Sequence, residues 1–357
     1  MMELYVTVGR GLDVFAEKHL EQLGAHITLK TEGKLAFSID DVSKLTNIKF
    51  VERLFGTVDI SESSAFTKSD LLNHLHQVVS SKDRLKNAVV QLKSAKRQKI
   101  DDDAITFRLS IKATGKWKKR IDVSRLSKDL SAKVTSCTGW SSDLRNATTE
   151  ICIHVGPAFC AVGIPVFRNP LSCRSYLKHP GLRSTVCDAM ISLAELESDS
   201  CTVLDITCGN GTLLFEAAAA YPQIYAIGCD QNADALATAK NNLAFCQDAL
   251  GRKIHVDFMR ADTTNVMLRV PSDRIIADLP FGQQHCTAAE IATLYPLLVK
   301  SISRLLNRNG IAVLLTSASN HELLISCCSK ESLMLINKYP LSLGDTDGVI
   351  CVFKFSK

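Results

Sequence analysis

The chain has 357 residues, of which 46% are apolar and 22% are charged, a composition typical of soluble globular proteins. This length suggests two or three domains with ample material for buried cores. The start of the chain lacks the basic region and apolar run of a secretory signal, and no window reaches the ~20 apolar residues of a membrane span. The 13 cysteines show no Cys-x-x-Cys spacing, so we expect reduced thiols that act as small buried hydrophobes, in the cytosol or nucleus.

The net charge of +5 is unevenly distributed along the chain. Residues 1–170 carry 26 Lys and Arg against 19 Asp and Glu, a balance of +7, whereas residues 171–357 carry 16 against 18, a balance of −2. A basic excess confined to one half of a chain favours an acidic partner such as nucleic acid for that half.

Residues 1–60 alternate between strand and helix patterns. Strands are predicted near 4–8, 26–30 and 34–39, and helices near 13–23, which ends at Gly24, and near 41–54. This order in about sixty residues predicts a small α+β domain of ferredoxin-like type over 1–60.

Residues 61–166 repeat an α+β pattern with a more basic character. Helices are predicted near 68–79 and 124–135, and strands near 105–113, 150–155 and 158–164. Between Lys82 and Arg120 there are 13 basic residues and only 4 acidic ones, and residues 93–99 are expected to form a flexible loop.

The basic residues are densest at the end of the strand predicted near 105–113. The candidate RNA contacts there are Lys112, Lys116, Trp117, Lys118, Lys119 and Arg120, and Arg174 in the following segment is a further candidate. The cations can bind phosphates while the indole stacks on a base. The alternative is a solvated loop that Trp117 anchors to the core.

Residues 167–200 form an irregular linker and a lead-in helix, predicted from Ser184 or Thr185, either of which can serve as the N-cap, to Leu196. From residue 201 strands and helices alternate. Strands are predicted at 201–206, 224–229, 254–259, 273–278, 310–316, 333–337 and 348–354, and helices at 212–220, 232–245, 288–307 and 319–329. The first five strands predict a parallel, doubly wound α/β sheet, and the last two an antiparallel edge pair. This arrangement is similar to the seven-stranded, Rossmann-like sheet of class I methyltransferases.

A glycine turn follows the first of these strands. Asp205 lies four residues before Gly209, and Gly211 precedes a predicted helix with free N-terminal amides. A dinucleotide fingerprint would need a third glycine where Leu214 stands. Asp-x-x-x-Gly-x-Gly instead resembles the first motif of S-adenosylmethionine-dependent methyltransferases, which makes Asp205, Thr207, Cys208, Gly209 and Gly211 candidate cofactor ligands. A plain structural turn is the alternative.

Two further predicted strands also end in carboxylates. Asp230 can accept hydrogen bonds from the ribose hydroxyls of an adenosine, although it also suits the N-cap of the helix that follows. Asp262 can accept from an adenine amine, and a plain loop aspartate is its alternative. Ligands of open parallel sheets bind at the C-terminal ends of the strands, so we expect both residues to lie near the glycine turn.

The fourth strand ends in Asp278, Leu279, Pro280 and Phe281, which resembles the Asp-Pro-Pro-Tyr/Phe motif of methyltransferases that act on exocyclic amines of bases. Such a nitrogen is a poor nucleophile because its lone pair is delocalised into the ring. A carboxylate and a backbone carbonyl can accept its two N–H groups, proline fixes the turn, and the aromatic ring can stack on the base. Asp278 is a candidate for both the catalytic and the cofactor site.

Three motifs carry a resemblance to a whole family: Gly9-Arg10-Gly11-Leu12, Gly181-Leu182-Arg183-Ser184-Thr185, and Asp278-Leu279-Pro280-Phe281-Gly282. They resemble the THUMP-domain RNA methyltransferases. That resemblance covers nearly the whole chain and is weakest over 60–165. It implies a ferredoxin-like domain over 1–60, an RNA-binding THUMP domain over 61–166, a linker over 167–200 and a class I catalytic domain over 201–357. Leucine in place of the first proline is also found in this family.

The resemblance further implies the activity, the cofactor S-adenosylmethionine and the partners. The family makes N2-methylguanosine in RNA, and the most similar subgroup acts on U6 snRNA in the nucleus with a small activator subunit. A sister subgroup acts on tRNA, so tRNA is the first alternative substrate. A cytoplasmic location is the alternative to the nucleus. A non-catalytic RNA-binding protein that retains the fold is the second.

Overall fold

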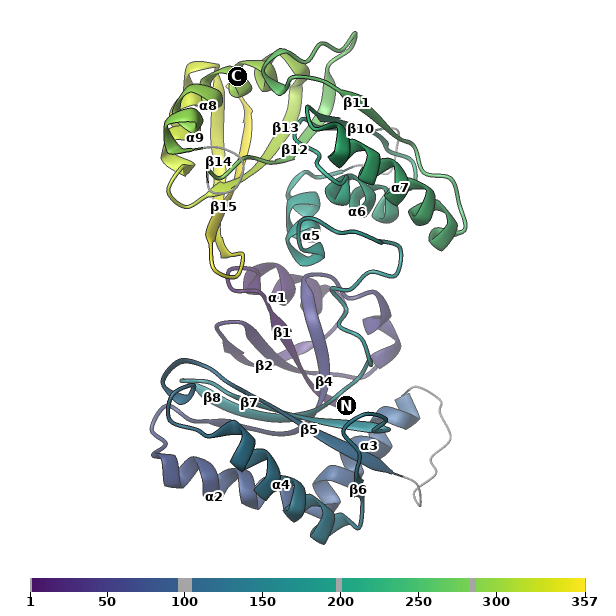
Figure 1. The fold of residues 1–357 in the computed structure, drawn as a ribbon, viewed down its shortest axis with the longest axis vertical. Helices are drawn as coiled ribbons and strands as arrows, with labels where there is room; N and C mark the ends of the chain where they lie inside the picture. Colours follow the sequence, from purple (N-terminus) through teal and green to yellow (C-terminus); the bar gives the residue numbers. More distant parts are fainter. Residues whose placement is uncertain (1, 96–104, 197–200, 283–286, 357) are drawn as a thin grey trace. The chain divides into compact units, whose positions relative to one another are not determined.

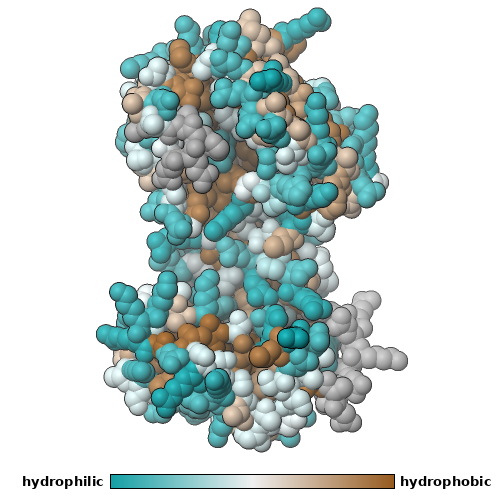
Figure 2. Space-filling view, in the orientation of Figure 1, coloured by the Kyte–Doolittle hydropathy of each residue, from teal (hydrophilic) through white to brown (hydrophobic). Residues whose placement is uncertain are grey.

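The computed structural model describes residues 2–95, 105–196, 201–282 and 287–356. The chain forms two compact units (Figure 1). The first unit comprises residues 1–8 and 16–171, and the second comprises residues 9–15 and 172–357. Figure 2 shows mainly hydrophilic residues on the visible face of each unit, with smaller apolar patches within each face.

The first unit is built on one eight-stranded sheet in the order β2-β3-β1-β4-β8-β7-β5-β6. Its strands are β1 (Met2–Val8), β2 (His26–Thr31), β3 (Lys34–Ile39), β4 (Val51–Glu62), β5 (Thr106–Ala113), β6 (Ser141–Ser142), β7 (Thr149–Val155) and β8 (Phe159–Pro165). The long strand β4 pairs antiparallel with β1 on one side and with β8 on the other. The two predicted α+β patterns therefore share a single sheet.

The helix predicted over 41–54 is wrong. The structure has a short 3-10 helix, η1 (Val42–Asn47), whose first turn is capped by Asp41, and then the strand β4. Phe50, with a positive φ of 65°, separates the two elements. The sequence from Val51 onward is rich in β-branched and aromatic residues, which favour a strand once partners are present on both sides.

The helices of the first unit are α1 (Asp13–Gln22), which begins in the second unit, α2 (Lys68–Val79), α3 (Lys82–Ala95) and α4 (Val123–Thr138). In Figure 1, α2 and α4 lie along one face of the sheet. Helix α3 was not predicted, although Leu85, Val89 and Leu92 form a buried stripe at helical spacing. It packs on β4 at Gly56, where a Cβ would lie 2.9 Å from Leu92. Of the loop predicted over 93–99, the first residues belong to α3 and the rest lies outside the described residues.

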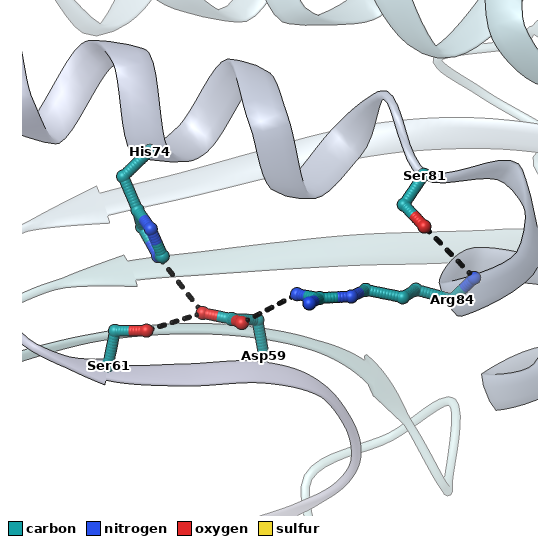
Figure 3. Close-up of polar contacts among 5 residues, drawn as sticks. All are labelled: Asp59, Ser61, His74, Ser81 and Arg84. Carbon is teal, nitrogen blue, oxygen red and sulfur yellow. Dashed lines mark hydrogen bonds and ion pairs between the residues drawn. The ribbon is translucent and has the colours of Figure 1, made fainter.

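Polar contacts around Asp59 join three elements of this unit (Figure 3). One carboxylate oxygen of Asp59 on β4 accepts from Ser61 at 2.9 Å and lies 3.0 Å from His74 Nε2 on α2. The other accepts from Arg84 on α3 at 2.9 Å. These charge-assisted bonds at a half-buried carboxylate fix both helices to the strand.

The second unit is a seven-stranded sheet in the order β11-β10-β9-β12-β13-β15-β14. Its strands are β9 (Thr202–Asp205), β10 (Tyr225–Asp230), β11 (Val256–Arg260), β12 (Ser272–Asp278), β13 (Leu306–Ser317), β14 (Leu333–Ser342) and β15 (Asp347–Phe355). The first five are parallel, and β15 and β14 pair antiparallel at one edge. The predicted strands and topology are confirmed.

Helices cover both faces of this sheet. They are α5 (Ser184–Leu193), α6 (Thr212–Ala220), α7 (Ala233–Leu250), α8 (Ala288–Leu305) and α9 (His321–Lys330). In Figure 1, α8 and α9 lie on one face, and α5, α6 and α7 lie on the other. The N-cap of α5 is Arg183 and makes no side-chain cap, so neither predicted cap residue serves that role. Ten of the 12 described cysteines are buried and all 12 are free. No helix among the described residues is long and apolar enough to cross a membrane.

Candidate active site

The backbone of the glycine turn after β9 is shaped by two glycines, Gly209 and Gly211. Gly209 and Gly211 have positive φ angles of 49° and 78°, which favour glycine. A Cβ on Gly211 would lie 2.8 Å from Phe215 Cε2 and 3.0 Å from Phe258 Cζ, whereas one on Gly209 would meet nothing within 4 Å. Gly211 is also the N-cap of α6 and makes no side-chain cap. The turn therefore packs tightly on one side and opens on the other, beside the first amides of a helix.

Asp205 ends β9 and is almost fully buried, with 2% of its surface exposed. Its carboxylate accepts a hydrogen bond from the backbone N–H of Thr207 at 3.0 Å. Burial holds the pKa of Asp205 well above its usual value, which the bond from Thr207 partly offsets and the negative charges of Asp278 and Asp230 reinforce. A carboxylate in this position stabilises a cationic group placed next to it.

Asp230 ends β10 and supports the glycine turn. Its Oδ2 accepts from the Gly209 N–H at 2.9 Å, and its Oδ1 accepts from the Asn232 N–H at 2.8 Å. The N-cap of α7 is Asn232, whose side chain accepts from the N–H groups of residues 234 and 235. The alternative role of Asp230 as the helix cap is therefore wrong, and its carboxylate lies at the strand end beside the open glycine turn.

Asp262 follows β11 and is exposed. It caps the 3-10 helix η4 (Thr263–Asn265), and its Oδ1 accepts from the backbone and hydroxyl of Thr264 at 2.9 and 2.8 Å. These hydrogen bonds lower the pKa of Asp262. The contact from the Ala261 N–H to the Asp230 carbonyl, 3.1 Å long, joins this turn to the end of β10.

Asp278 ends β12 and is joined to the glycine turn through Thr207. The Thr207 hydroxyl donates to the Asp278 backbone carbonyl at 3.0 Å. Burial raises the pKa of the Asp278 carboxyl to about 7. The two strand ends that carry the most specific motifs are therefore in direct contact, as predicted from the topology.

The three residues after Asp278 make their hydrogen bonds through backbone atoms. The Leu279 side chain is 2% exposed and packs in the core, and its N–H donates to the Leu315 carbonyl at 2.9 Å. Any contribution of Leu279 to a ligand site must come from its carbonyl. Pro280 and Phe281 are half-buried.

Two residues that the sequence analysis missed hold this turn. The Tyr295 hydroxyl on α8 donates to the Pro280 carbonyl at 2.9 Å, and the Asn320 side-chain amide donates to the Phe281 carbonyl at 3.0 Å. Asn320 follows a fifth strand end, that of β13, and could have been suspected on that ground. The sequence contains no signal for Tyr295.

Arg174, a predicted RNA contact, forms ion pairs with two carboxylates of the second unit. Its guanidinium lies 2.6 Å from Asp188 Oδ2 on α5 and 3.4 Å from Glu216 Oε1 on α6. Tyr176 donates to the other oxygen of Glu216 at 2.6 Å. Burial raises the pKa of Glu216, and the charge of Arg174 partly offsets this shift. The prediction that Arg174 contacts RNA is corrected, because two buried carboxylates occupy its guanidinium.

The predicted basic patch lies in the first unit, at the end of β5 and around the 3-10 helix η3 (Gly115–Trp117). Its five cations are all exposed: Lys112, Lys116, Lys118, Lys119 and Arg120. Trp117 is 0% exposed, so its ring is not available to stack on a base and instead anchors the loop to the core. The Lys116 ammonium lies 5.0 Å from the centroid of the indole and donates to the Ser64 carbonyl at 3.0 Å.

The sequence is similar to a known family model and to two known methyltransferases. Residues 172–345 match the family model UPF0020, an RMKL-like methyltransferase domain. The U6 snRNA (guanine-N(2))-methyltransferase THUMPD2 of Bos taurus is 35% identical in an alignment 238 residues long that covers 63% of this chain and 46% of that protein. The tRNA (guanine(6)-N(2))-methyltransferase THUMP3 of Homo sapiens is 28% identical over 62% of this chain and 45% of that protein. The chain thus spans less than half the length of these relatives.

Two solved structures share the fold over essentially the whole chain. TrmN from Thermus thermophilus superposes with a TM-score of 0.77 at 19% identity, covering 100% of both chains. SMU.472, solved as a complex with SAH, superposes with a TM-score of 0.74 at 15% identity, covering 100% of this chain and 98% of that one. The predicted fold class is confirmed.

Proposed function

We propose that the chain, whose residues 172–345 match an RMKL-like methyltransferase domain, is an S-adenosylmethionine-dependent RNA methyltransferase that makes N2-methylguanosine in U6 snRNA. The observation that carries the proposal is the contact between the glycine turn and the Asp278 turn, through the 3.0 Å hydrogen bond from Thr207 to the Asp278 carbonyl. It brings a cofactor turn and an amine-accepting carboxylate into one site.

The residues of the glycine turn fit S-adenosylmethionine. The open side of Gly209 leaves room for a ligand against the backbone, and the buried Asp205 carboxylate suits the ammonium of the methionine end. Asp230, at the next strand end, is placed to accept from ribose hydroxyls. Thr207, Cys208 and Gly211 shape the turn, and Asp262 is the proposed adenine contact. When bound, this cofactor supplies a methyl group on a sulfonium.

Asp278 is the proposed catalytic residue, assisted by the carbonyl of Leu279. Each can accept one N–H of the guanosine N2 amine, which favours a pyramidal nitrogen whose lone pair is available for attack. The ionised carboxylate is a stronger acceptor than the neutral acid, and with a pKa of about 7 Asp278 is only partly ionised at neutral pH. Phe281 is the proposed stacking partner of the base. Positioning and local electrostatics supply the acceleration, without a covalent enzyme intermediate.

The choice of RNA is supported by the higher identity to the U6 snRNA enzyme, 35%, than to the tRNA enzyme, 28%. Purified full chain, with labelled S-adenosylmethionine, is expected to methylate U6 transcripts faster than tRNA transcripts. Faster methylation of tRNA would show that tRNA, and not U6 snRNA, is the substrate. Methylation of neither, with S-adenosylmethionine bound, would favour a non-catalytic RNA-binding protein.

A THUMP domain over 61–166 is the proposed RNA-binding part, with the first 60 residues as a ferredoxin-like domain. Replacing Lys116, Lys118, Lys119 and Arg120 together by alanine is expected to weaken U6 binding and to reduce the slope of log affinity against log salt by about 3. The reason is that exposed cations displace counterions from phosphates. Filter binding at several salt concentrations measures both quantities.

A matched variant removes the same charge elsewhere in the first unit: Arg125, Lys128, Lys133 and Arg145, all exposed, replaced by alanine. Its salt slope is expected to stay close to that of the wild type. Equal slopes for the two quadruple variants would remove the patch from the proposed interface.

A small activator subunit and a nuclear location complete the proposal, and both rest on the family resemblance. A heterodimer with that subunit is expected to co-purify from cells that express the tagged chain. The U6 assay is therefore performed with the chain alone and with the co-purified complex.

A further inference from the structure

The backbone of the Asp278 turn is held by side chains from three separate elements. The Asp278 carbonyl accepts from Thr207, the Pro280 carbonyl from Tyr295, and the Phe281 carbonyl from Asn320, at 3.0, 2.9 and 3.0 Å. Among the residues that the structure describes, no donor reaches the carbonyl of Leu279. The carbonyl that the proposed function needs for an amine N–H is thus the one, among those of residues 278–281, to which no described residue donates.

The hydroxyl of Tyr295 is buried, so its hydrogen bonds must be made inside the protein. Its side chain is 0% exposed, and a buried hydroxyl requires a partner. Its oxygen lies 2.7 Å from Thr316 Oγ1 on β13 as well as 2.9 Å from the Pro280 carbonyl. Since a phenol has one proton, which goes to the carbonyl, the Thr316 hydroxyl must donate to the phenol oxygen. This chain of bonds fixes the direction of the Tyr295 proton towards the turn.

The side chain of Asn320 also binds the turn and does not cap the helix that it precedes. It is the N-cap of α9, a position where an asparagine side chain usually accepts from helix amides, yet it makes no side-chain cap. Its side-chain NH2 group donates to the Phe281 carbonyl, 39 residues earlier in the chain. The only side-chain role of Asn320 among the described residues is thus to bind the turn.

We infer that Tyr295 and Asn320 are positioning residues that fix the carbonyls of Pro280 and Phe281, and so hold the Leu279 carbonyl and the Asp278 carboxylate in place for an amine. The kinetic part of this inference rests on the proposed function. Neither residue touches the reacting atoms. Both act through the turn, because a turn whose flanking carbonyls are fixed has little freedom to reorient the remaining one.

The test uses two nearly isosteric variants of the full chain, Tyr295→Phe and Asn320→Asp, which remove the donor and keep the shape. Tyr225→Phe and Asn337→Asp are the matched controls, because they remove a hydroxyl and an amide of the same unit whose partners are Asp257 and Tyr339. Each test variant is expected to lower kcat by about 5- to 10-fold, the effect of one lost hydrogen bond. KM for S-adenosylmethionine and for RNA should stay unchanged.

Hydrogen exchange provides a second readout that does not require activity. The backbone amides of residues 278–282 are expected to exchange faster in the two test variants than in the two controls. The reason is that a turn whose carbonyls have lost their donors opens more often. If the wild-type chain transfers no methyl group, the proposed function fails, and hydrogen exchange still decides whether the turn is braced. Exchange equal to that of the controls would overturn the inference, and so would faster exchange with an unchanged kcat in an active enzyme.

Discussion

Replacing Asp278 with alanine is expected to lower kcat of methyl transfer by about 100- to 1,000-fold, the range seen when one transition-state hydrogen-bonding group is removed. The substitution removes the carboxylate that accepts from the amine. It keeps the backbone carbonyl to which Thr207 donates, so the glycine turn should hold its shape. Affinity for S-adenosylmethionine, measured by calorimetry, should therefore change little. A loss of cofactor binding as large as the loss of kcat would contradict the assigned role.

Asp273→Ala is the matched control, because Asp273 lies near the other end of the same strand. Its carboxylate accepts from Thr202 and Asn307 and has no place in the site. This variant should lose stability but keep its kcat per folded molecule.

The pH profile of the wild type checks the same role of Asp278. Since burial raises the pKa of Asp278 to about 7, the carboxyl is mostly protonated below that pH, and the neutral acid is a weaker acceptor than the carboxylate. The rate should rise with pH through about 7 and level off above it. The residual rate of Asp278→Ala should lack this step.

Replacing Asp230 with alanine is expected to weaken S-adenosylmethionine binding by about 100-fold, because two charge-assisted contacts of ~1.5 kcal/mol or more are affected. One is the proposed contact with the ribose. The other is the 2.9 Å bond from the Gly209 N–H, which holds the turn against the end of β10. Calorimetric titration of the full chain measures the dissociation constant.

Asp257→Ala serves as the control for this variant. Asp257 is exposed on β11, and its carboxylate accepts from Tyr225 away from the glycine turn. Its dissociation constant should equal that of the wild type. An Asp230→Ala protein that binds the cofactor as tightly as this control would remove Asp230 from the site.

The fold of the second unit could be predicted from the sequence because each strand carries its own signal. The parallel strands are short apolar runs, such as that around Val203 and Leu204, bounded by turn residues and separated by helices of ordinary length. The same regularity predicted that Asp205, Asp230 and Asp278 would meet at one edge, and the structure places them there. Local pattern and topology were sufficient.

The remaining features depend on contacts between distant residues. The helix predicted over 41–54 includes only the first four residues of β4, whose partner strand β8 lies about a hundred residues later in the chain. Trp117 was ambiguous because only tertiary packing decides whether an aromatic residue in a basic loop is exposed. Arg174 meets Glu216 from 42 positions away in the chain. Tyr295 and Asn320 act on backbone carbonyls, which no residue pattern reveals.

The identity of the methylated nucleoside tests the central claim most directly. The full chain, with its co-purified partner where one is found, is incubated with a U6 transcript and S-adenosylmethionine carrying a deuterated methyl group. The RNA is then digested to nucleosides for mass spectrometry. If Asp278 and the Leu279 carbonyl act on the guanosine N2 amine, the product is deuterated N2-methylguanosine, formed about 100- to 1,000-fold more slowly by Asp278→Ala. Label on the adenosine N6 amine, or on a ring nitrogen of guanosine, would contradict the account.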